Sequence, residues 1–234
     1  MTKDTHIETF FYFSSDKSII SVFSNKDFEP LYRNECFFKF SNNEINLEKV
    51  VEFFDENIFK IEKKINQFVK NINLIIDDDI FLHIDTGIKE NIYNQTVSEK
   101  DQIILLNHLK NDFKKNYPNF LIIHFIINKY IIDGRNFAHL ENNINSKNFC
   151  IETTFICLLK EYKLSIDKIF KKYQISINKL ISAKYLKKLF RNHQIDECEM
   201  AYKLQLRHNQ NEVVMTPKNV KNPGFFERFF YLFD

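Results

Sequence analysis

The chain has 234 residues, with 33 Lys and Arg against 31 Asp and Glu, and 44% of its residues are hydrophobic. This length fits one domain or two small ones with a packed core, and a net charge of +2 gives no whole-molecule field for nucleic acid or a membrane. Glycine occurs only at Gly87, Gly134 and Gly224, which excludes the closely spaced glycines of a phosphate-binding loop.

The cysteines and the first residues of the chain favour a reducing compartment. The four cysteines lie far apart and form no C-x-x-C pair: Cys36, Cys150, Cys157 and Cys198. We therefore expect free thiols. Residues 1–6 are polar and lack the apolar region of a signal peptide, and no charge-free apolar stretch approaches the roughly 18 residues of a membrane span. These features predict a cytoplasmic protein.

Aromatic and β-branched residues predict an N-terminal β-hairpin over residues 8–23 and a third strand around residues 31–40. Residues 47–70 carry apolar side chains at three- and four-residue steps, with Glu and Lys between them, which predicts an amphipathic helix. Residues 73–84 have the pattern of two strands separated by the aspartates 77–79. We expect the apolar stripe of the helix to lie on the preceding strands.

The middle of the chain predicts a second group of elements. Ser98 begins a capping box ahead of a helix over residues 99–116. Residues 120–128 and 149–159 are strongly apolar strands, with an Asp-Gly turn at residues 133–134 between them.

In the last third, Ser165 is the expected N-cap of a helix that runs to Tyr173. A short strand over residues 175–181 and a lysine-rich helical turn over residues 183–190 follow, and residues 191–222 are polar and weakly patterned. The predicted order is β-β-β-α-β and then β-α-β-β-α-β, which is a mixed α and β architecture of two packed units.

Three acidic or histidine-containing groups are candidate chemical sites. The run Asp77–Asp79 would suit a cation only if its carboxylates converged, but successive side chains of an extended segment alternate in direction, so a solvated turn is favoured. His83 with Asp85, or His124 in its apolar run, would need a third group at motif spacing to form a metal or acid–base site. A hydrogen-bonded core histidine is the commoner case.

Lysines recur along residues 160–188 without the interleaved aromatic side chains of a nucleic-acid platform, so a solvated helix face is favoured. The sequence therefore predicts no metal, no cofactor, no catalytic residue and no nucleic-acid partner.

The C-terminal residues form the most distinctive pattern. Five phenylalanines would share one face of a helix over residues 223–234: Phe225, Phe226, Phe229, Phe230 and Phe233. Such a segment is typical of a helix that lies in a membrane interface, with Lys221 and Arg228 as nearby cations. The pattern fits a terminal helix docked on the protein's own core equally well, and amphipathicity alone leaves both open.

A single short helix of this kind would bind a membrane reversibly. Burial of each Phe ring contributes about 1.5–3 kcal/mol, and this is opposed by ordering about eleven residues at roughly 1 kcal/mol or more each. Durable attachment would require several copies acting together.

Four segments, together with the C-terminal pattern, resemble the bacterial cell-division protein FtsA, an actin-like membrane tether of the division ring. They are Val97–Asp101, Ile123–Gly134, Cys150–Leu158 and Ile169–Ala183. The first opens a helix, and the second is similar to the family's His-containing strand followed by Tyr and Asp. The last two resemble the closing strands and the return to the actin-like lobe. The resemblance covers roughly residues 8–190 and 209–234.

The chain departs from this family where nucleotide would bind. The family's first phosphate loop is Asp-Ile-Gly-Thr/Ser-Ser-Lys, and the aligned residues here run from Tyr12 through Ser14 and Ser15 to Lys17, so the acid and the glycine are both replaced. The second phosphate loop and the adenosine-binding glycines have no counterpart. The second actin-like lobe, which carries the FtsZ-binding surface, is missing. The resemblance thus implies a truncated relative that neither binds nor hydrolyses ATP.

The resemblance also implies the domain organisation. Residues 1–86 and 165–190 would form a partial actin-like (ribonuclease-H-like) lobe, and residues 87–164 an inserted partner-binding subdomain of strand–helix–strand–strand order. Residues 191–222 would be a linker to the membrane-targeting helix at residues 223–234.

The implied function is that of a peripheral adaptor on the inner face of the cell membrane at the division site. Residues 87–164 would bind division-ring proteins. Association of the chain with a second copy of itself is a further candidate interaction. His124, Tyr130, Asp133 and Gly134 are expected to maintain the fold. Three alternatives stay open: an actin-like ATPase completed by a partner chain, a soluble interaction domain with a self-docked helix, and an adaptor of type IV pilus assembly.

Overall fold

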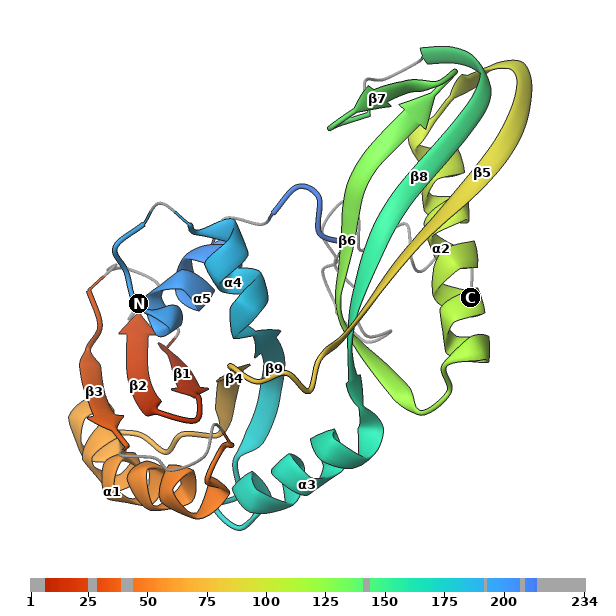
Figure 1. The fold of residues 1–234 in the computed structure, drawn as a ribbon. Coiled ribbons are helices and arrows are strands. Elements are labelled where there is room, and N and C mark those ends of the chain that lie inside the picture. Colours follow the sequence, from red (N-terminus) through yellow and green to blue (C-terminus); the bar gives the residue numbers. More distant parts are fainter. Residues whose placement is uncertain are drawn as a thin grey trace. The chain divides into compact units, whose positions relative to one another are not determined.

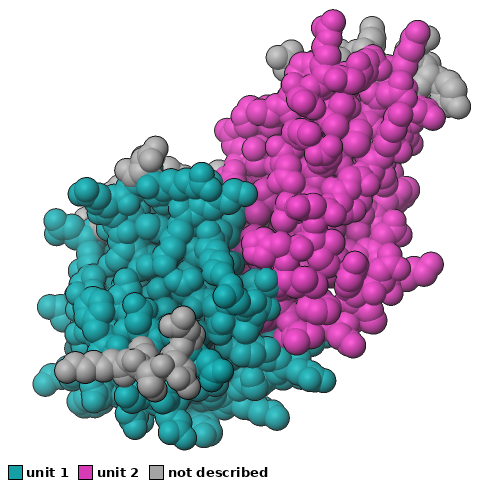
Figure 2. Space-filling view, viewed as in Figure 1, with its two compact units in different colours: residues 1–81, 160–208 teal, residues 82–159, 209–234 magenta. Residues whose placement is uncertain are grey.

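The computed structural model describes residues 7–24, 29–38, 44–140, 144–191, 193–206 and 209–213. The chain divides into two compact units, which Figure 2 shows in different colours. Unit 1 contains residues 1–81 and 160–208, and unit 2 contains residues 82–159 and 209–234. Unit 2 is thus an insertion into unit 1, and the chain returns to unit 2 at residues 209–213. The insertion was predicted at residues 87–164, five residues later at each boundary.

Unit 1 is built on a five-stranded sheet with the order β3-β2-β1-β4-β9 (Figure 1). Its strands are β1 (Ile7–Phe13), β2 (Lys17–Ser24), β3 (Tyr32–Phe37), β4 (Asn71–Ile76) and β9 (Ser176–Ser182). The first three form an antiparallel meander, whereas β4 pairs parallel with β1 and β9 pairs parallel with β4. The carboxyl ends of β1, β4 and β9 therefore lie at the same end of the sheet.

Helices cover both faces of this sheet because β1 is apolar on both sides. The helices are α1 (Leu47–Ile65), α3 (Lys160–Lys171), α4 (Ala183–Leu189) and α5 (Glu197–Leu206). Phe11 points to α1 and α3, with its ring 5.3 Å from that of Phe54 and 6.1 Å from that of Phe170. Phe10 and Tyr12 point to the opposite face and form a buried cluster with α4 and α5. This division follows from the alternation of side chains along a strand.

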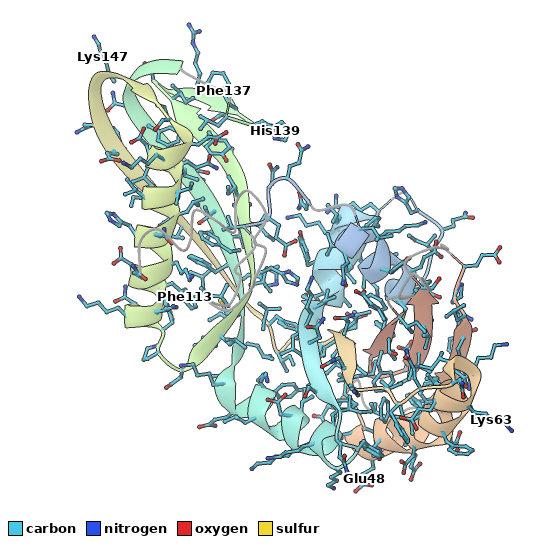
Figure 3. The ribbon with its side chains drawn as sticks, turned by 180° about the vertical axis from the view of Figure 1, so that it is seen from behind. Glu48, Lys63, Phe113, Phe137, His139 and Lys147 are labelled. Carbon is cyan, nitrogen blue, oxygen red and sulfur yellow. The ribbon has the colours of Figure 1, made fainter. Side chains whose placement is uncertain are left out.

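Local signals set the ends of α1. The side chain of Asn46 caps its first turn, and Asn66 adopts the left-handed conformation with φ 54°, so the helix ends at Ile65 and not at the predicted residue 70. Glu48 lies in the first turn and Lys63 in the last, as Figure 3 labels them, and these charges complement the helix dipole.

Unit 2 is a four-stranded antiparallel sheet with the order β5-β8-β6-β7 and one helix. Its elements are β5 (Leu82–Val97), α2 (Glu99–Asn116), β6 (Phe120–Ile132), β7 (Arg135–Phe137) and β8 (Ile144–Leu159). Phe113 of α2 faces the strands (Figure 3), with its ring 4.8 Å from that of Phe155 on β8. Phe155 in turn lies 4.4 Å from Phe125 on β6. These aromatic contacts hold α2 on the sheet.

The predicted fold class is confirmed. Both sheets and the helices around them give a mixed α+β protein, and the insertion has the order strand–helix–strand–strand–strand, with the short strand β7 added to the predicted order. The predicted capping box of α2 is confirmed as well. The backbone N–H of Asp101 donates to Ser98 Oγ at 3.3 Å, and the backbone N–H of Ser98 donates to Asp101 Oδ2 at 2.8 Å.

Two local predictions in this part of the chain are wrong. Ser165 is not an N-cap, because α3 begins at Lys160 directly after β8, and the Ser165 hydroxyl donates inside the helix to the carbonyl of Tyr162 at 2.7 Å. The strands predicted as a pair within residues 73–84 do not pair, because β4 belongs to the sheet of unit 1 and β5 to that of unit 2.

The segment predicted as a linker, residues 191–222, contains the buried helix α5, so that prediction is wrong for this part. The ring of Tyr202 stacks on that of Phe23 at 4.4 Å, and its hydroxyl donates to the carbonyl of Ser24 at 2.6 Å. The sequence pattern missed α5 because residues 200–202 are buried in succession and do not follow one regular stripe.

We expect Tyr202→Ala to lower the free energy of unfolding by about 3–5 kcal/mol, as for other large aromatic truncations in a core. Chemical denaturation followed by circular dichroism measures this. Phe59, which is 72% exposed on α1, provides the matched control, and Phe59→Ala should change stability by less than about 0.5 kcal/mol. Equal effects of the two substitutions would mean that α5 does not pack as described.

Candidate functional site

The carboxyl ends of the parallel strands of unit 1 carry a group of charged side chains. Phe13 pairs with Ile76, and Ile76 with Ser182, so β1, β4 and β9 end side by side. Ligands of open sheets with parallel strands commonly bind outside these ends. Five residues meet there and are called the charged cluster below: Tyr12, Lys17, Asp77, Lys187 and Glu197.

The topology brings these residues together from five elements. Tyr12 lies near the end of β1 and Lys17 begins β2. Asp77 follows β4 directly, with its backbone N–H bonded to the carbonyl of Phe13 at 3.0 Å. Lys187 and Glu197 come from α4 and from the first turn of α5, the two helices on the Tyr12 face of the sheet.

The charges of the cluster alternate and are paired with one another. Lys17 Nζ donates to Glu197 Oε2 at 3.1 Å, and Lys187 Nζ lies 3.3 Å from Glu197 Oε1 and 2.5 Å from Asp77 Oδ2. The Tyr12 hydroxyl donates to Asp77 Oδ2 at 3.1 Å. Both ammonium groups also lie near the Tyr12 ring, at 5.2 and 5.8 Å from its centroid. An anionic ligand would therefore have to compete with two resident carboxylates.

The turn at the degenerate phosphate-loop position is closed by its own side chain. Ser14 Oγ accepts from the backbone N–H of Lys17 at 3.0 Å and of Asp16 at 3.4 Å. The same hydroxyl lies within hydrogen-bond distance of Asp16 Oδ1 at 2.6 Å. Ser15 is half-buried at the turn. In a phosphate loop, backbone N–H groups point at the ligand. Here two of the turn's backbone N–H groups donate to Ser14 Oγ instead.

Burial and charge shift two pKa values in the cluster. Burial raises the pKa of Tyr12 well above its usual value, and the nearby charges of Glu197 and Asp77 add to this effect although a hydrogen bond from Ser14 opposes it. For Lys187, burial lowers the pKa, but the hydrogen bond and charge of Asp77, helped by Glu197, outweigh it and the pKa is raised. Tyr12 is thus held neutral and Lys187 charged.

One prediction about a charged residue is wrong. Asp77 is not part of a solvated turn, since its carboxylate lies in the charged cluster with its side chain only 19% exposed. Asp79, by contrast, is 91% exposed and pairs with Lys184. Lys187, predicted on a solvated face, is 45% exposed as expected, and its ammonium group also belongs to the cluster. The sequence pattern does not single out Glu197, because this residue lies in the segment predicted as a linker.

In unit 2, the structure places His124 and Tyr130 in the sheet interior. The buried His124 has its Nδ1 2.7 Å from Glu212 Oε1. The Tyr130 hydroxyl accepts a hydrogen bond from the side chain of Gln102 on α2. Burial raises the pKa of Tyr130 to about 12.

Asp133 and Gly134 form the two-residue turn between β6 and β7. Their φ angles are 46° and 83°, which suits the primed turn favoured in hairpins. Asp133 Oδ1 also accepts from the backbone N–H groups of Lys147 at 3.0 Å and Asn148 at 2.9 Å, which ties the turn to β8.

The chain returns to unit 2 after α5. The backbone N–H of Ile127 donates to the carbonyl of Asn211 at 2.7 Å, and that of Val213 donates to the carbonyl of Phe125 at 2.8 Å. Glu212 forms an antiparallel bridge with Ile126. Residues 209–213, called the docked segment below, thus extend the sheet along β6, and Glu212 reaches His124 from there.

The predicted membrane-binding residues lie outside the described residues. These are Lys221, Phe225, Phe226, Arg228, Phe229, Phe230 and Phe233. Within the described part of the chain, no helix is long and apolar enough to cross a membrane. The same residues contain no group of three or more His, Cys, Asp or Glu side chains arranged for a metal ion, and His83 and Asp85 therefore stay without a third ligand there.

Comparison with protein-family models and with curated protein sequences gave no match. Among solved structures, the chain is similar to the cytoplasmic domain of EpsL, an inner membrane component of the type II secretion system of Vibrio cholerae. The TM-score is 0.38 and the identity 7%, over 77% of this chain and 59% of that one. It is also similar to a Bacteroides thetaiotaomicron protein with an actin-like ATPase fold and unknown function, with a TM-score of 0.30, 14% identity, and 80% and 57% of the two chains covered. The chain spans less than two thirds of the length of both.

We expect Tyr12→Phe and the unchanged protein to exchange their order of stability at high pH. Near neutral pH the variant loses the hydrogen bond to Asp77 and should be less stable by about 1–2 kcal/mol. Above about pH 10 the unfolded chain releases the tyrosine proton while the folded chain retains it, so the free energy of unfolding of the unchanged protein falls by up to about 1.4 kcal/mol per pH unit from this group. Denaturant titrations from pH 8 to pH 12 should therefore cross, and a constant difference across that range would contradict the assignment.

Proposed function

We propose that the chain is an FtsA-like peripheral membrane adaptor of the bacterial division ring, without ATPase activity of its own. Residues 223–234 would bind the inner face of the cell membrane, and unit 2, the insertion predicted at residues 87–164 and found at residues 82–159, would present a surface to division-ring proteins. The observation that carries the proposal is the attachment of the docked segment, residues 209–213, to the edge of β6.

The docked segment sets where the C-terminal segment starts. Residues 214–222 separate it from the Phe-rich residues 223–234, and at most about 3.3–3.6 Å per residue this spacer reaches about 30 Å. Without docking, the spacer would begin after Leu206 and reach roughly 55 Å. Docking therefore keeps unit 2, the unit with the proposed partner surface, closer to any membrane that the C-terminal segment binds.

The charged cluster supports the part of the proposal that concerns nucleotide. Lys17, the one residue that aligns with the phosphate-loop lysine, is directed to Glu197. The turn amides that would contact a phosphate are bonded to Ser14. Binding of ATP would require breaking these contacts and bringing phosphates close to Asp77 and Glu197, which is unfavourable by charge.

Membrane binding is tested by flotation on vesicles of phosphatidylglycerol and phosphatidylethanolamine. We expect the full chain to float, and a chain ending at Thr216 or the variant Phe229→Glu/Phe230→Glu to stay at the bottom, because two charges on the apolar face oppose its burial. Raised salt should weaken binding only partly, since burial of the Phe rings does not depend on charge.

The control for flotation is Phe59→Glu/Phe68→Glu, which changes two phenylalanines of unit 1 that are 72% and 79% exposed and should still float. If the full chain fails to float, the membrane role is wrong. Resistance of residues 223–234 to proteolysis in lipid-free buffer would then favour the self-docked helix.

We expect Mg-ATP to leave the thermal unfolding midpoint unchanged. A site with a Kd of about 10 μM would add about 2.7 kcal/mol of stability at about 1 mM ligand, which would raise the midpoint by several degrees. Differential scanning calorimetry with ADP and Mg²⁺ alone as references measures this, and a rise specific to ATP would refute the absence of a nucleotide site in the isolated chain.

A further inference from the structure

The two edges of the unit 2 sheet differ. On one side, β6 is followed by β7 and by the docked segment, which together pair with its outer edge. On the other side, β5 is the last strand, and within the described ranges of the chain β8 is its one strand neighbour. β5 pairs with β8 in continuous register over ten residues, from Leu82 to Asn91. Such a long edge strand offers a row of backbone donors and acceptors to another strand.

The side chains along this edge are exposed and ordered by face. Asp85 and Lys89 are exposed and lie on the face away from α2, since they alternate with Ile84 and Ile88, which pack against the core of unit 2. Gly87 stands midway between Asp85 and Lys89 and is exposed as well. The edge therefore has an acidic and a basic residue placed symmetrically about one central position.

We propose that β5 pairs with β5 of a second copy of this chain, antiparallel and centred on Gly87, to join two unit 2 sheets. In this register Asp85 of each copy lies directly opposite Lys89 of the other. A two-fold axis perpendicular to the sheet repeats the contact, so one favourable pair becomes two. No shift of the register by one residue keeps both pairs, so the charges select this alignment.

The rest of the edge suits the same register. Thr86 of each copy lies opposite Ile88 of the other, on the α2 face, and this is a contact between two β-branched side chains that sheets favour. The apolar layer beneath Ile84 and Ile88 thereby continues from one copy into the other. Two short strand segments bury little area, so the dimer is a reversible one. This inference does not depend on the proposed membrane role, because it concerns the chain in solution.

The test is sedimentation equilibrium of the full chain in lipid-free buffer, from about 1 μM to about 1 mM, a range that covers reversible dimers. We expect a monomer–dimer equilibrium. Asp85→Lys places lysine opposite lysine, and Lys89→Asp places aspartate opposite aspartate, so each variant should weaken the dimer about tenfold or more. Substitution of Gly87 is unsuitable, because a Cβ there would lie 3.3 Å from the Ile151 carbonyl oxygen of its own sheet.

Mixing gives the decisive result. Asp85→Lys chains carry two lysines and Lys89→Asp chains carry two aspartates, so an equimolar mixture should form a heterodimer at least as tight as the wild-type dimer. The double variant Asp85→Lys/Lys89→Asp should restore the homodimer. Lys147→Asp on β8, a strand inside the sheet, is the matched charge reversal and should leave the equilibrium unchanged (Figure 3).

Each of the following outcomes would overturn the proposal. If the wild-type chain is monomeric at all concentrations, β5 does not pair with a second copy. The same conclusion follows if the dimer is insensitive to both charge reversals. A dimer that is lost in Phe229→Glu/Phe230→Glu but not in the β5 variants would arise from the C-terminal segment instead. A full chain that is monomeric but dimerises when ended at Thr216 would mean that its own C-terminal residues occupy the edge.

Discussion

The fold of unit 1 depends on β1 being apolar on both faces. Phe10, Phe11, Tyr12 and Phe13 are consecutive and buried, so neither side of the central strand can face water. The chain meets this requirement with α1 and α3 on one face and α4 and α5 on the other. The second pair of helices comes after the insertion, so unit 1 is complete only when the chain has returned from unit 2. α5 is therefore part of the core, and its loss would expose the Phe10 face of the sheet.

The same constraint explains the charged cluster. α4 and α5 must lie on the Tyr12 face, and each then brings a charged residue to the end of the sheet where β1 and β4 finish. Glu197 is buried there, and a buried carboxylate requires close cations. Lys17 and Lys187 supply them, while Asp77 and the Tyr12 hydroxyl complete the pairing. The end of the sheet at which a ligand would be expected is thus used to stabilise the packing of the two C-terminal helices of the unit.

Sequence reasoning predicted the elements whose patterns are local and failed where burial is decided at long range. The helix over residues 99–116 was predictable because its capping box lies within four residues, and the Asp133-Gly134 turn because its chemistry is specific to φ > 0. The helix α5 was missed since its burial depends on Phe23, far away in sequence. Likewise, Asp77 and Glu197 acquire their roles from neighbours more than a hundred residues away, Lys187 and Lys17. No spacing rule within a single sequence relates such residues, and only the sheet topology does.

The unit 2 sheet links the two proposals through its opposite edges. The docked segment occupies the β6 edge and ends there at Val213, whereas β5 is left for a second copy. Pairing two sheets through β5 would place a C-terminal segment at each outer edge of the joined sheet, and both would come from the same assembly. A single Phe-rich helix binds a membrane reversibly, but a second helix on the same assembly binds at a high effective concentration once the first is engaged. A weak dimer and a weak membrane helix would then reinforce each other, since each copy held at the membrane raises the local concentration that favours pairing.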